Sequence, residues 1–243
     1  MNDVHMILQG KGGVGKSLTA VVLAQYLRSK GGMVICADTD PVNATFTQYT
    51  SLDVAHVDIV EAGNVIQRKF DPLMEMIVST EADFVIDNGA ATFMPLTRYL
   101  HENDIFQIMS EAGKKVYVHT VLTGGQAKSD TYNGFSELLG KVNSFAKVVV
   151  WENEFWGKVE YESHPITASK LFREADKAGK IAGIVRIVDR SQSDTFVGDM
   201  KQMSENHMTL ADVMASGDFN FLSKNRLQKV IAEVFAELNQ VEW

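Results

Sequence analysis

The sequence is poor in the residues that mark several specialised classes of protein. Its 243 residues include one cysteine and four prolines. A lone cysteine excludes an internal disulfide framework, and it is too few for a four-thiolate iron–sulfur cluster shared across a dimer. Cys36 lies inside the apolar run MVICA, so we expect it to be a small buried hydrophobic residue rather than a reactive thiol.

Long apolar runs and an excess of positive charge are also missing. No stretch approaches the ~18 consecutive apolar residues of a membrane span, and the segment MNDVHMILQGKGG lacks the cationic start and longer apolar run of a secretory leader. Lysine and arginine number 23 against 31 aspartates and glutamates, a formal net charge of −8. That balance argues against binding bare nucleic acid through overall charge, although it leaves a local basic patch open. We expect a cytoplasmic protein.

The chain does contain a regular alternation of short apolar runs and amphipathic segments. Predicted strands cover residues 4–8, 33–37, 83–87, 115–121, 146–151 and 181–188, and predicted helices cover residues 16–30, 65–78, 95–109, 128–142, 166–178 and 219–239. Nearly continuous apolar strands that alternate with helices indicate an α/β fold, a doubly wound and mostly parallel sheet with helices on both faces. With no low-complexity linker and no repeat, we expect one domain over residues 1–243.

The last predicted helix carries an apolar stripe made of Leu227, Val230, Ile231, Val234, Phe235 and Leu238. Such a stripe predicts packing on the sheet. A membrane-surface helix is the alternative, but the polar face carries Glu233, Glu237 and Glu242 beside its basic residues. Because an anionic membrane favours a more basic face, we favour core packing.

The segment GKGGVGKS, residues 10–17, matches the phosphate-loop pattern G-x-x-x-x-G-K-[ST] and lies between the first predicted strand and the first predicted helix. Glycines let successive backbone N–H groups point at phosphates, and the start of the helix adds the positive end of its dipole. Lys16 is expected to reach the β- and γ-phosphates of ATP or ADP, and the Ser17 hydroxyl is expected to coordinate Mg²⁺. The predicted nucleotide-binding residues here are Gly10, Lys11, Gly12, Gly13, Val14, Gly15, Lys16, Ser17 and Leu18.

Aspartates follow two of the predicted strands. Asp87 ends the run DFVID in the manner of a Walker B carboxylate, which acts on Mg²⁺, whereas an isolated aspartate in such a place is more often a turn or helix-cap residue. The phosphate loop upstream favours the metal role. Asp38 and Asp40 follow the second strand, and two carboxylates so close together indicate a nearby cation or water nucleophile.

Three segments together, KGGVGKS with its early Lys11, DTDP after the second strand and the apolar strand that ends in Asp87, resemble the deviant Walker A family of ParA, MinD and the nitrogenase iron protein. The resemblance implies a homodimer in the ATP state, in which Lys11 reaches the partner's nucleotide as an arginine finger does. It also implies that Asp40 orients or activates the attacking water and joins Ser17 and Asp87 near the metal. The predicted catalytic residues are therefore Lys11, Lys16 and Asp40. In the alternative interpretation, Lys11 is only a solvated loop lysine.

By the same resemblance, Asp38 supports the first switch loop, Asn43 lies near the water shell of the metal and Asn153 binds the adenine. Three features depart from the family pattern. Leu18 replaces the usual Ser or Thr, the DPVNAT of DPVNATF is one residue shorter than D-P-Q-G-N-A-T, and NGAATF replaces the second switch, which is usually rich in proline and glycine. We expect these changes to remove one contact to the α-phosphate, to shift the register of Asn43 and to alter the coupling of the second switch.

Longer stretches resemble one branch of this family, the group of conjugal transfer protein TraL and plasmid-stability protein StbB. They are HMILQGKGGVGKS, DTDPVNATF, VIDNGAATFMPLTRYL, HTVLTGGQA and VVVWENEFWG. This resemblance implies an ATP-dependent switch with weak or partner-stimulated hydrolysis, acting in plasmid conjugal transfer or plasmid stability and positioning. The expected partners are plasmid-encoded conjugation or stability proteins, and direct contact with DNA or a membrane stays open. The alternatives are a non-hydrolysing nucleotide-binding scaffold and a metabolic ATP-dependent enzyme on the same fold.

Overall fold

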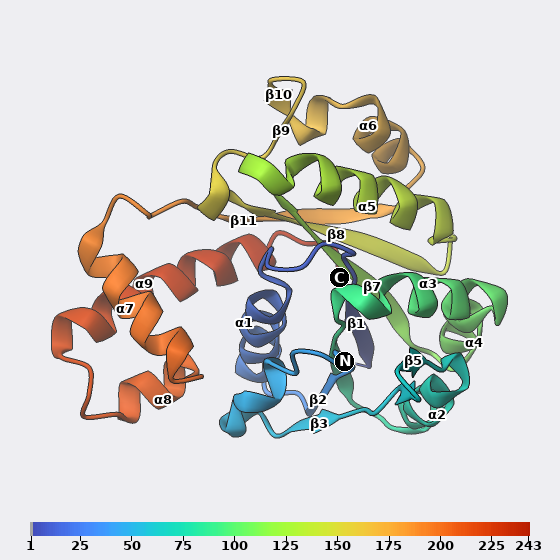
Figure 1. The fold of residues 1–243 in the computed structure, drawn as a ribbon, viewed down its shortest axis with the longest axis horizontal. Coiled ribbons are helices and arrows are strands. Elements are labelled where there is room, and N and C mark those ends of the chain that lie inside the picture. Colours follow the sequence, from blue (N-terminus) through green and yellow to red (C-terminus); the bar gives the residue numbers. More distant parts are fainter. Residues whose placement is uncertain (1) are drawn as a thin grey trace.

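A parallel β-sheet forms the centre of the computed structural model, which describes residues 2–243 (Figure 1). Within that range the sheet has seven strands in the order β11-β8-β7-β1-β6-β2-β3, and every neighbouring pair is parallel. The strands are β1 (Asp3–Ile7), β2 (Val34–Asp38), β3 (Val54–His56), β6 (Asp83–Asp87), β7 (Lys115–Thr123), β8 (Ala146–Asn153) and β11 (Ile181–Ile187). From β1 the chain first forms β2, β3 and β6 on one side and then β7, β8 and β11 on the other, which confirms the predicted doubly wound α/β fold. Met1, the start of the segment assessed as a leader, lies outside the described residues.

Helices cover both faces of the sheet. They are α1 (Lys16–Ser29), α2 (Asp71–Ser79), α3 (Phe93–Glu102), α4 (Ile105–Glu111), α5 (Lys128–Lys141), α6 (Lys170–Lys177), α7 (Asp194–Glu205), α8 (Leu210–Ala215) and α9 (Phe221–Leu238). Side chains alternate between the faces along a strand, so Met6 and Ile7 of β1 enter different cores. Met6 packs in the core formed with α2 to α6, and Ile7 packs in the core formed with α1 and α9.

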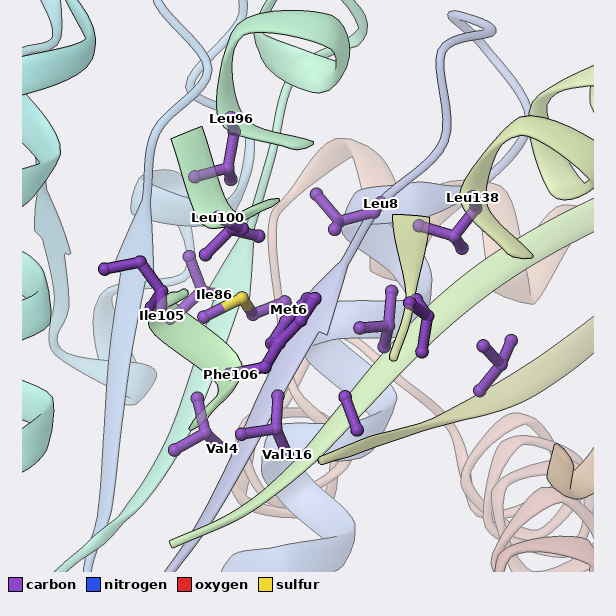
Figure 2. Close-up of a cluster of buried hydrophobic side chains, with 14 of the residues drawn as sticks. Val4, Met6, Leu8, Ile86, Leu96, Leu100, Ile105, Phe106, Val116 and Leu138 are labelled. Carbon is purple, nitrogen blue, oxygen red and sulfur yellow. The ribbon is translucent and has the colours of Figure 1, made fainter. Parts of the chain in front are cut away.

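The core around Met6 fixes β1 and thereby the loop that follows it (Figure 2). The side chains labelled there come from β1 and the residue after it, from the neighbouring strands and from α3, α4 and α5: Val4, Met6, Leu8, Ile86, Leu96, Leu100, Ile105, Phe106, Val116 and Leu138. Each large apolar side chain of this kind contributes about 1.5–3 kcal/mol when it is fully buried. A loop anchored on such a strand has a well-defined starting point.

The structure confirms the six predicted strands and corrects several helix boundaries. The helix predicted at 95–109 is two helices, α3 and α4, because Asp104 adopts a left-handed conformation (φ 50°) between them. The helix predicted at 65–78 starts at Asp71, after a 3₁₀ turn. The helix predicted at 166–178 starts at Lys170, where Ser169 Oγ accepts a hydrogen bond from Phe172 N (3.2 Å).

Some elements carry no clear sequence signal. The patterns predict neither β3 nor α7 and α8, because these elements bury few side chains. Two short hairpins also lie outside the main sheet, β4 (Val60–Glu61) with β5 (Asn64–Val65) and β9 (Glu160–Tyr161) with β10 (His164–Pro165).

The last helix packs on the sheet, as its stripe predicts. Four residues of the stripe are buried and the other two are partly buried: Leu227, Ile231, Val234 and Leu238, then Val230 and Phe235. The start of α9 stands beside the sheet with α7 and α8 (Figure 1), around a small separate core that includes Met203, Val213 and Phe219. In residues 2–243, none of the helices combines the length and apolar character that a membrane crossing requires.

Candidate nucleotide-binding site

A glycine-rich loop connects the end of β1 to the start of α1. Gly13 and Gly15 have positive φ angles of 73° and 101°, which side chains other than glycine rarely adopt. Gly15 is further restricted by space, because a Cβ atom there would lie 2.8 Å from Asn153 Nδ2. Helix α1 begins at Lys16 with no side-chain cap, so its first backbone N–H groups are free to bind an anion.

Two buried amides hold this loop in place. Gln9 Nε2 donates to the carbonyl oxygens of Val121 and Thr131 (3.1 Å each), and Gln9 Oε1 accepts from Lys11 N (3.3 Å). Asn153 Nδ2 donates to Val14 O (3.0 Å) at the other end of the loop, and Asn153 Oδ1 accepts from Phe155 N (3.2 Å). Gln9 was outside the predicted site, since a glutamine before a glycine loop has no recognised pattern.

Lys16 lies inside the loop with its side chain almost wholly buried, 8% exposed. Its ammonium group donates to Lys11 O (2.8 Å). Burial lowers the pKa of Lys16, and the nearby carboxylates of Asp87 and Asp40 act in the opposite direction. A buried ammonium group with a single backbone partner and carboxylates close by is well placed to bind an anionic ligand with its metal ion.

Asp87 ends β6 beneath the loop and is 2% exposed. Burial raises its pKa to about 7; the Ser17 hydroxyl and Lys16 lower it, and Asp38 and Asp40 raise it further. Its Oδ1 atom is buried and has no hydrogen-bond partner among the described residues. A buried carboxylate oxygen without a donor, close to a hydroxyl, fits a residue that holds Mg²⁺ directly or through water.

Asp38 and Asp40 organise the loop that follows β2. Asp38 is fully buried and accepts three backbone hydrogen bonds, from Asp40 N (2.9 Å), Phe46 N (3.0 Å) and Thr47 N (3.3 Å). Burial raises the pKa of Asp38, while these bonds lower it. Asp40 Oδ1 accepts from Val42 N (2.9 Å) and from the backbone of the exposed Asn43 (3.1 Å). Asp38 therefore has a purely structural set of contacts, whereas Asp40 lies at a cavity wall.

A cavity of about 480 Å³ opens beside the loop. Its lining consists of Gly12, Gly13, Gly15, Lys16, Ser17, Leu18, Asp40, Val42, Asn43, Thr45, Ala90 and Ala91. The cavity thus brings together most of the residues predicted from the loop pattern and the predicted water-orienting Asp40. Asp87 is not part of this lining, and no metal-binding cluster of three or more His, Cys, Asp or Glu side chains occurs in residues 2–243. Mg²⁺ is commonly held by one or two carboxylates together with substrate phosphates, so this donor set suits it.

A second cavity of about 730 Å³ adjoins the first, and both are lined by Gly13, Gly15 and Leu18. The second cavity is mostly apolar and extends between α1, α7 and α9; Asn153 and the loop after β11 form one wall. Two half-exposed aromatic residues, Phe155 and Trp156, stand at its edge. A ligand with a phosphate end and a planar apolar end would fit the two cavities together.

The early Lys11 does not line either cavity. Its ammonium group forms an ion pair with Asp130 Oδ2 (2.7 Å) at the start of α5, and its side chain is 43% exposed. An exposed pair of this kind contributes roughly 0–1 kcal/mol, so little free energy opposes its exchange for another anion. Asp130 was not among the predicted site residues, because only the fold brings it next to Lys11.

The chain matches the family model described as the CobQ/CobB/MinD/ParA nucleotide binding domain over residues 5–240. This chain belongs to that family. The match includes the glycine loop, both aspartate segments and Asn153, and it confirms the family predicted from the motifs.

Two relatives, both named Protein TraL and both from Escherichia coli, are 40% and 39% identical to this chain over 238 and 239 residues. Each comparison covers 98% of both chains. Among solved structures, the fold is similar to a putative plasmid partition protein from Borrelia burgdorferi bound to AMPPNP (TM-score 0.49, 15% identity, 97% of this chain and 99% of that one). It is also similar to the MinD cell division protein of Aquifex aeolicus (TM-score 0.48, 14% identity, 98% and 97% of the two chains). The family match over residues 5–240 covers nearly the whole chain.

Proposed function

We propose that this protein is an ATP-dependent switch that binds MgATP at the glycine loop, dimerises in the ATP state and hydrolyses ATP slowly. The observation that carries this proposal is the arrangement at the loop: a cavity lined by the buried Lys16 and by Asp40, and close to Lys16 a buried Asp87 oxygen without a hydrogen-bond donor. The family match over residues 5–240 supports a single nucleotide-binding domain.

In this proposal each residue of the site has a defined task. Lys16 and the N–H groups of the loop bind the phosphates, while Ser17 and Asp87 hold Mg²⁺, which neutralises phosphate charge when it is bound. Asp40, on the cavity wall and close enough to the others to share in the metal's surroundings, orients the attacking water. The base and ribose occupy the adjoining cavity beside Asn153, whose amide already binds the loop.

The proposed dimer forms through the face that carries Lys11. Within residues 2–243 of the single chain, the ion-pair partner of this lysine is the exposed carboxylate of Asp130. Two nucleotides that face each other across a dimer repel unless cationic groups lie between them, so Lys11 exchanges Asp130 for the partner's phosphates. The dimer would then depend on ATP and dissolve after hydrolysis, which is how a nucleotide controls partner binding.

The relatives named Protein TraL support a plasmid-associated role for this chain, in conjugal transfer or in plasmid stability. We propose that its partners are plasmid-encoded proteins of those processes and that it acts in the cytoplasm, where ATP is available. The net charge of −8 makes proteins better candidates than bare DNA.

The test is the molar mass by light scattering without nucleotide, with ADP and with ATP, alongside release of inorganic phosphate. We expect an ATP-dependent dimer that Asp40→Ala prolongs and Lys11→Ala weakens, whereas Lys177→Ala, a change of an exposed lysine on α6, leaves it intact. If the molar mass changes neither with ATP nor with Lys11→Ala, the proposed switch is refuted. An ATP-dependent dimer without phosphate release would instead identify a non-hydrolysing scaffold.

A further inference from the structure

A buried side-chain hydrogen bond joins the loop after β2 to the loop after β6. Thr39 and Asn88 are 0% and 1% exposed, and Thr39 Oγ1 donates to Asn88 Oδ1 (2.7 Å). Asn88 Nδ2 in turn donates to Ile7 O (3.1 Å), the last residue of β1. Thr39 N also donates to Asp87 O (2.9 Å), which continues the pairing of the two strands by one residue. Asn88 therefore connects the ends of three neighbouring strands at the phosphate cavity.

At the next residue, Gly89, lack of space requires a glycine. Its φ of −64° is open to any residue, so backbone conformation does not require glycine. A Cβ atom at Gly89 would instead lie 2.4 Å from Asp40 Cγ and 2.6 and 2.7 Å from its two carboxylate oxygens. The Asp40 carboxylate thus rests directly on the Gly89 backbone, and it can do so only because Gly89 has no side chain.

We propose that Asn88 and Gly89, here called the Asn88–Gly89 pair, are positioning residues for ATP hydrolysis that act by holding Thr39 and Asp40. Asn88 fixes the backbone on one side of Asp40, and Gly89 provides the space in which its carboxylate lies. This inference rests on the proposed role of Asp40 and adds the element that determines where that carboxylate is. It also gives a physical reason for the segment NGAATF after Asp87: a proline or alanine in place of Gly89 would displace Asp40.

Few other side chains could replace those of the Asn88–Gly89 pair. Asn88 both accepts from Thr39 and donates to Ile7 O, so aspartate would lose the donor, and leucine would lose both partners. The group that Gly89→Ala would collide with is the flexible end of Asp40 rather than backbone. The substitution is therefore expected to move the carboxylate and leave the fold intact.

The first experiment compares Gly89→Ala, Asp40→Ala and the double variant by single-turnover ATP hydrolysis and by ATP affinity. Loss of a correctly placed water-orienting group lowers a rate by typically 10²–10⁴-fold, so we expect Gly89→Ala to lower kcat by at least about 10-fold. ATP affinity should change by less than about 3-fold, because the pair touches neither Lys16 nor the loop glycines. In the Asp40→Ala background, Gly89→Ala should have almost no further effect on kcat. Gly140→Ala, at an exposed α5 glycine with nothing within 4 Å, is the matched control.

Thr39 offers a second pair of variants. Thr39→Val removes the hydroxyl and leaves Asn88 Oδ1 buried without its donor, whereas Thr39→Ser keeps the hydroxyl. We expect Thr39→Val to lower kcat in the same way as Gly89→Ala and Thr39→Ser to retain most of it. An equal loss of kcat in both Thr39 variants would overturn the proposal. So would a double variant in which the separate effects of Gly89→Ala and Asp40→Ala on kcat simply multiply.

Hydrogen exchange separates this proposal from the proposed function. The amides of Val42 and Asn43 donate to Asp40 Oδ1, so displacing that carboxylate exposes both to exchange. We expect faster exchange at these two amides in Gly89→Ala than in wild type and Gly140→Ala, without nucleotide. Unchanged exchange would overturn the pair as a support for Asp40. If wild type releases no phosphate, the proposed hydrolysis is refuted, and with it the role of the Asn88–Gly89 pair in hydrolysis. Hydrogen exchange at Val42 and Asn43 would still show whether the pair holds Asp40 in place.

Discussion

Acid should destabilise this protein through two histidines that the fold buries without charge. His5 of β1 and His119 of β7 are both 0% exposed, and their rings are joined by a hydrogen bond between His5 Nδ1 and His119 Nε2 (3.0 Å). Trp151 Nε1 donates to His119 Nδ1 (2.9 Å), so the proton of His119 must lie on Nε2 and point at His5. Neither ring can take up a second proton without placing two donors against each other or against the indole.

The size of this loss of stability can be calculated from the pKa shift of His5 alone. Burial lowers the pKa of His5 from 6.5 to about 3, and burial together with His5 lowers the pKa of His119 well below 6.5. The unfolded chain binds a proton at each site below about pH 6.5 and the folded chain does not, so stability is lost as pH falls from there toward 3. At about pH 5 the loss from His5 alone is about 2 kcal/mol, and any folded-state pKa below about 4 gives the same figure. His119 adds to this loss in the same direction.

The assay is equilibrium unfolding in urea at about pH 7.5 and about pH 5, followed by tryptophan fluorescence. We compare wild type with His5→Gln, which carries no titratable ring, and with His56→Gln, in which an exposed histidine is changed. The free energy of unfolding should fall by about 2 kcal/mol less in His5→Gln than in wild type over this pH interval. His56→Gln should behave like wild type. Equal losses in His5→Gln and wild type would refute the assignment of the acid sensitivity to this pair.

Two further substitutions test contacts elsewhere in the chain. Gly134→Ala on α5 would place a Cβ atom 2.3 Å from Gln9 Oε1. In thermal melts we expect this variant to lower the free energy of unfolding by about 1–3 kcal/mol. The control Gly140→Ala, on the same helix, should raise the free energy of unfolding by about 0.5–1 kcal/mol. A stabilised Gly134→Ala would contradict the contact with Gln9. Ser163, at the tip of the β9–β10 hairpin, has a φ of 64°. Ser163→Gly should therefore raise the free energy of unfolding by a few tenths of a kcal/mol to about 1 kcal/mol. A lower melting temperature in this variant would contradict backbone strain at Ser163.

The parts of the fold that depend on local pattern could be predicted from the sequence. The six apolar runs became strands because their residues are apolar on both faces of a covered sheet. The glycine loop was predicted because Gly13 and Gly15 belong to a pattern whose backbone geometry requires them. Lys16 and Ser17 followed from the same pattern, and the structure places both at the cavity.

Contacts between distant segments could not be predicted in this way. Asn88 meets Ile7 across 81 positions, and Gln9 meets Thr131 across 122. Gly89 and Gly134 look like ordinary glycines in the sequence, since neither has the positive φ that turn patterns reveal; each is required because another side chain occupies the space. A glycine needed for space is recognisable only after its neighbour is known.

In the proposed function, the groups that position the loops are separate from the groups that contact the ligand. Three buried amides, Gln9, Asn88 and Asn153, tie the loops to the ends of the strands, and each both donates and accepts. A carboxylate in any of these places would lack the donor and would add negative charge beside the phosphates, and a lysine would lack the acceptor. Because neutral amides hold the loops, the charged side chains of Lys16 and Asp40 are left free for the nucleotide roles that we propose for them. Changes to the amides should therefore alter geometry first, whereas changes to the charged residues should alter affinity or rate directly.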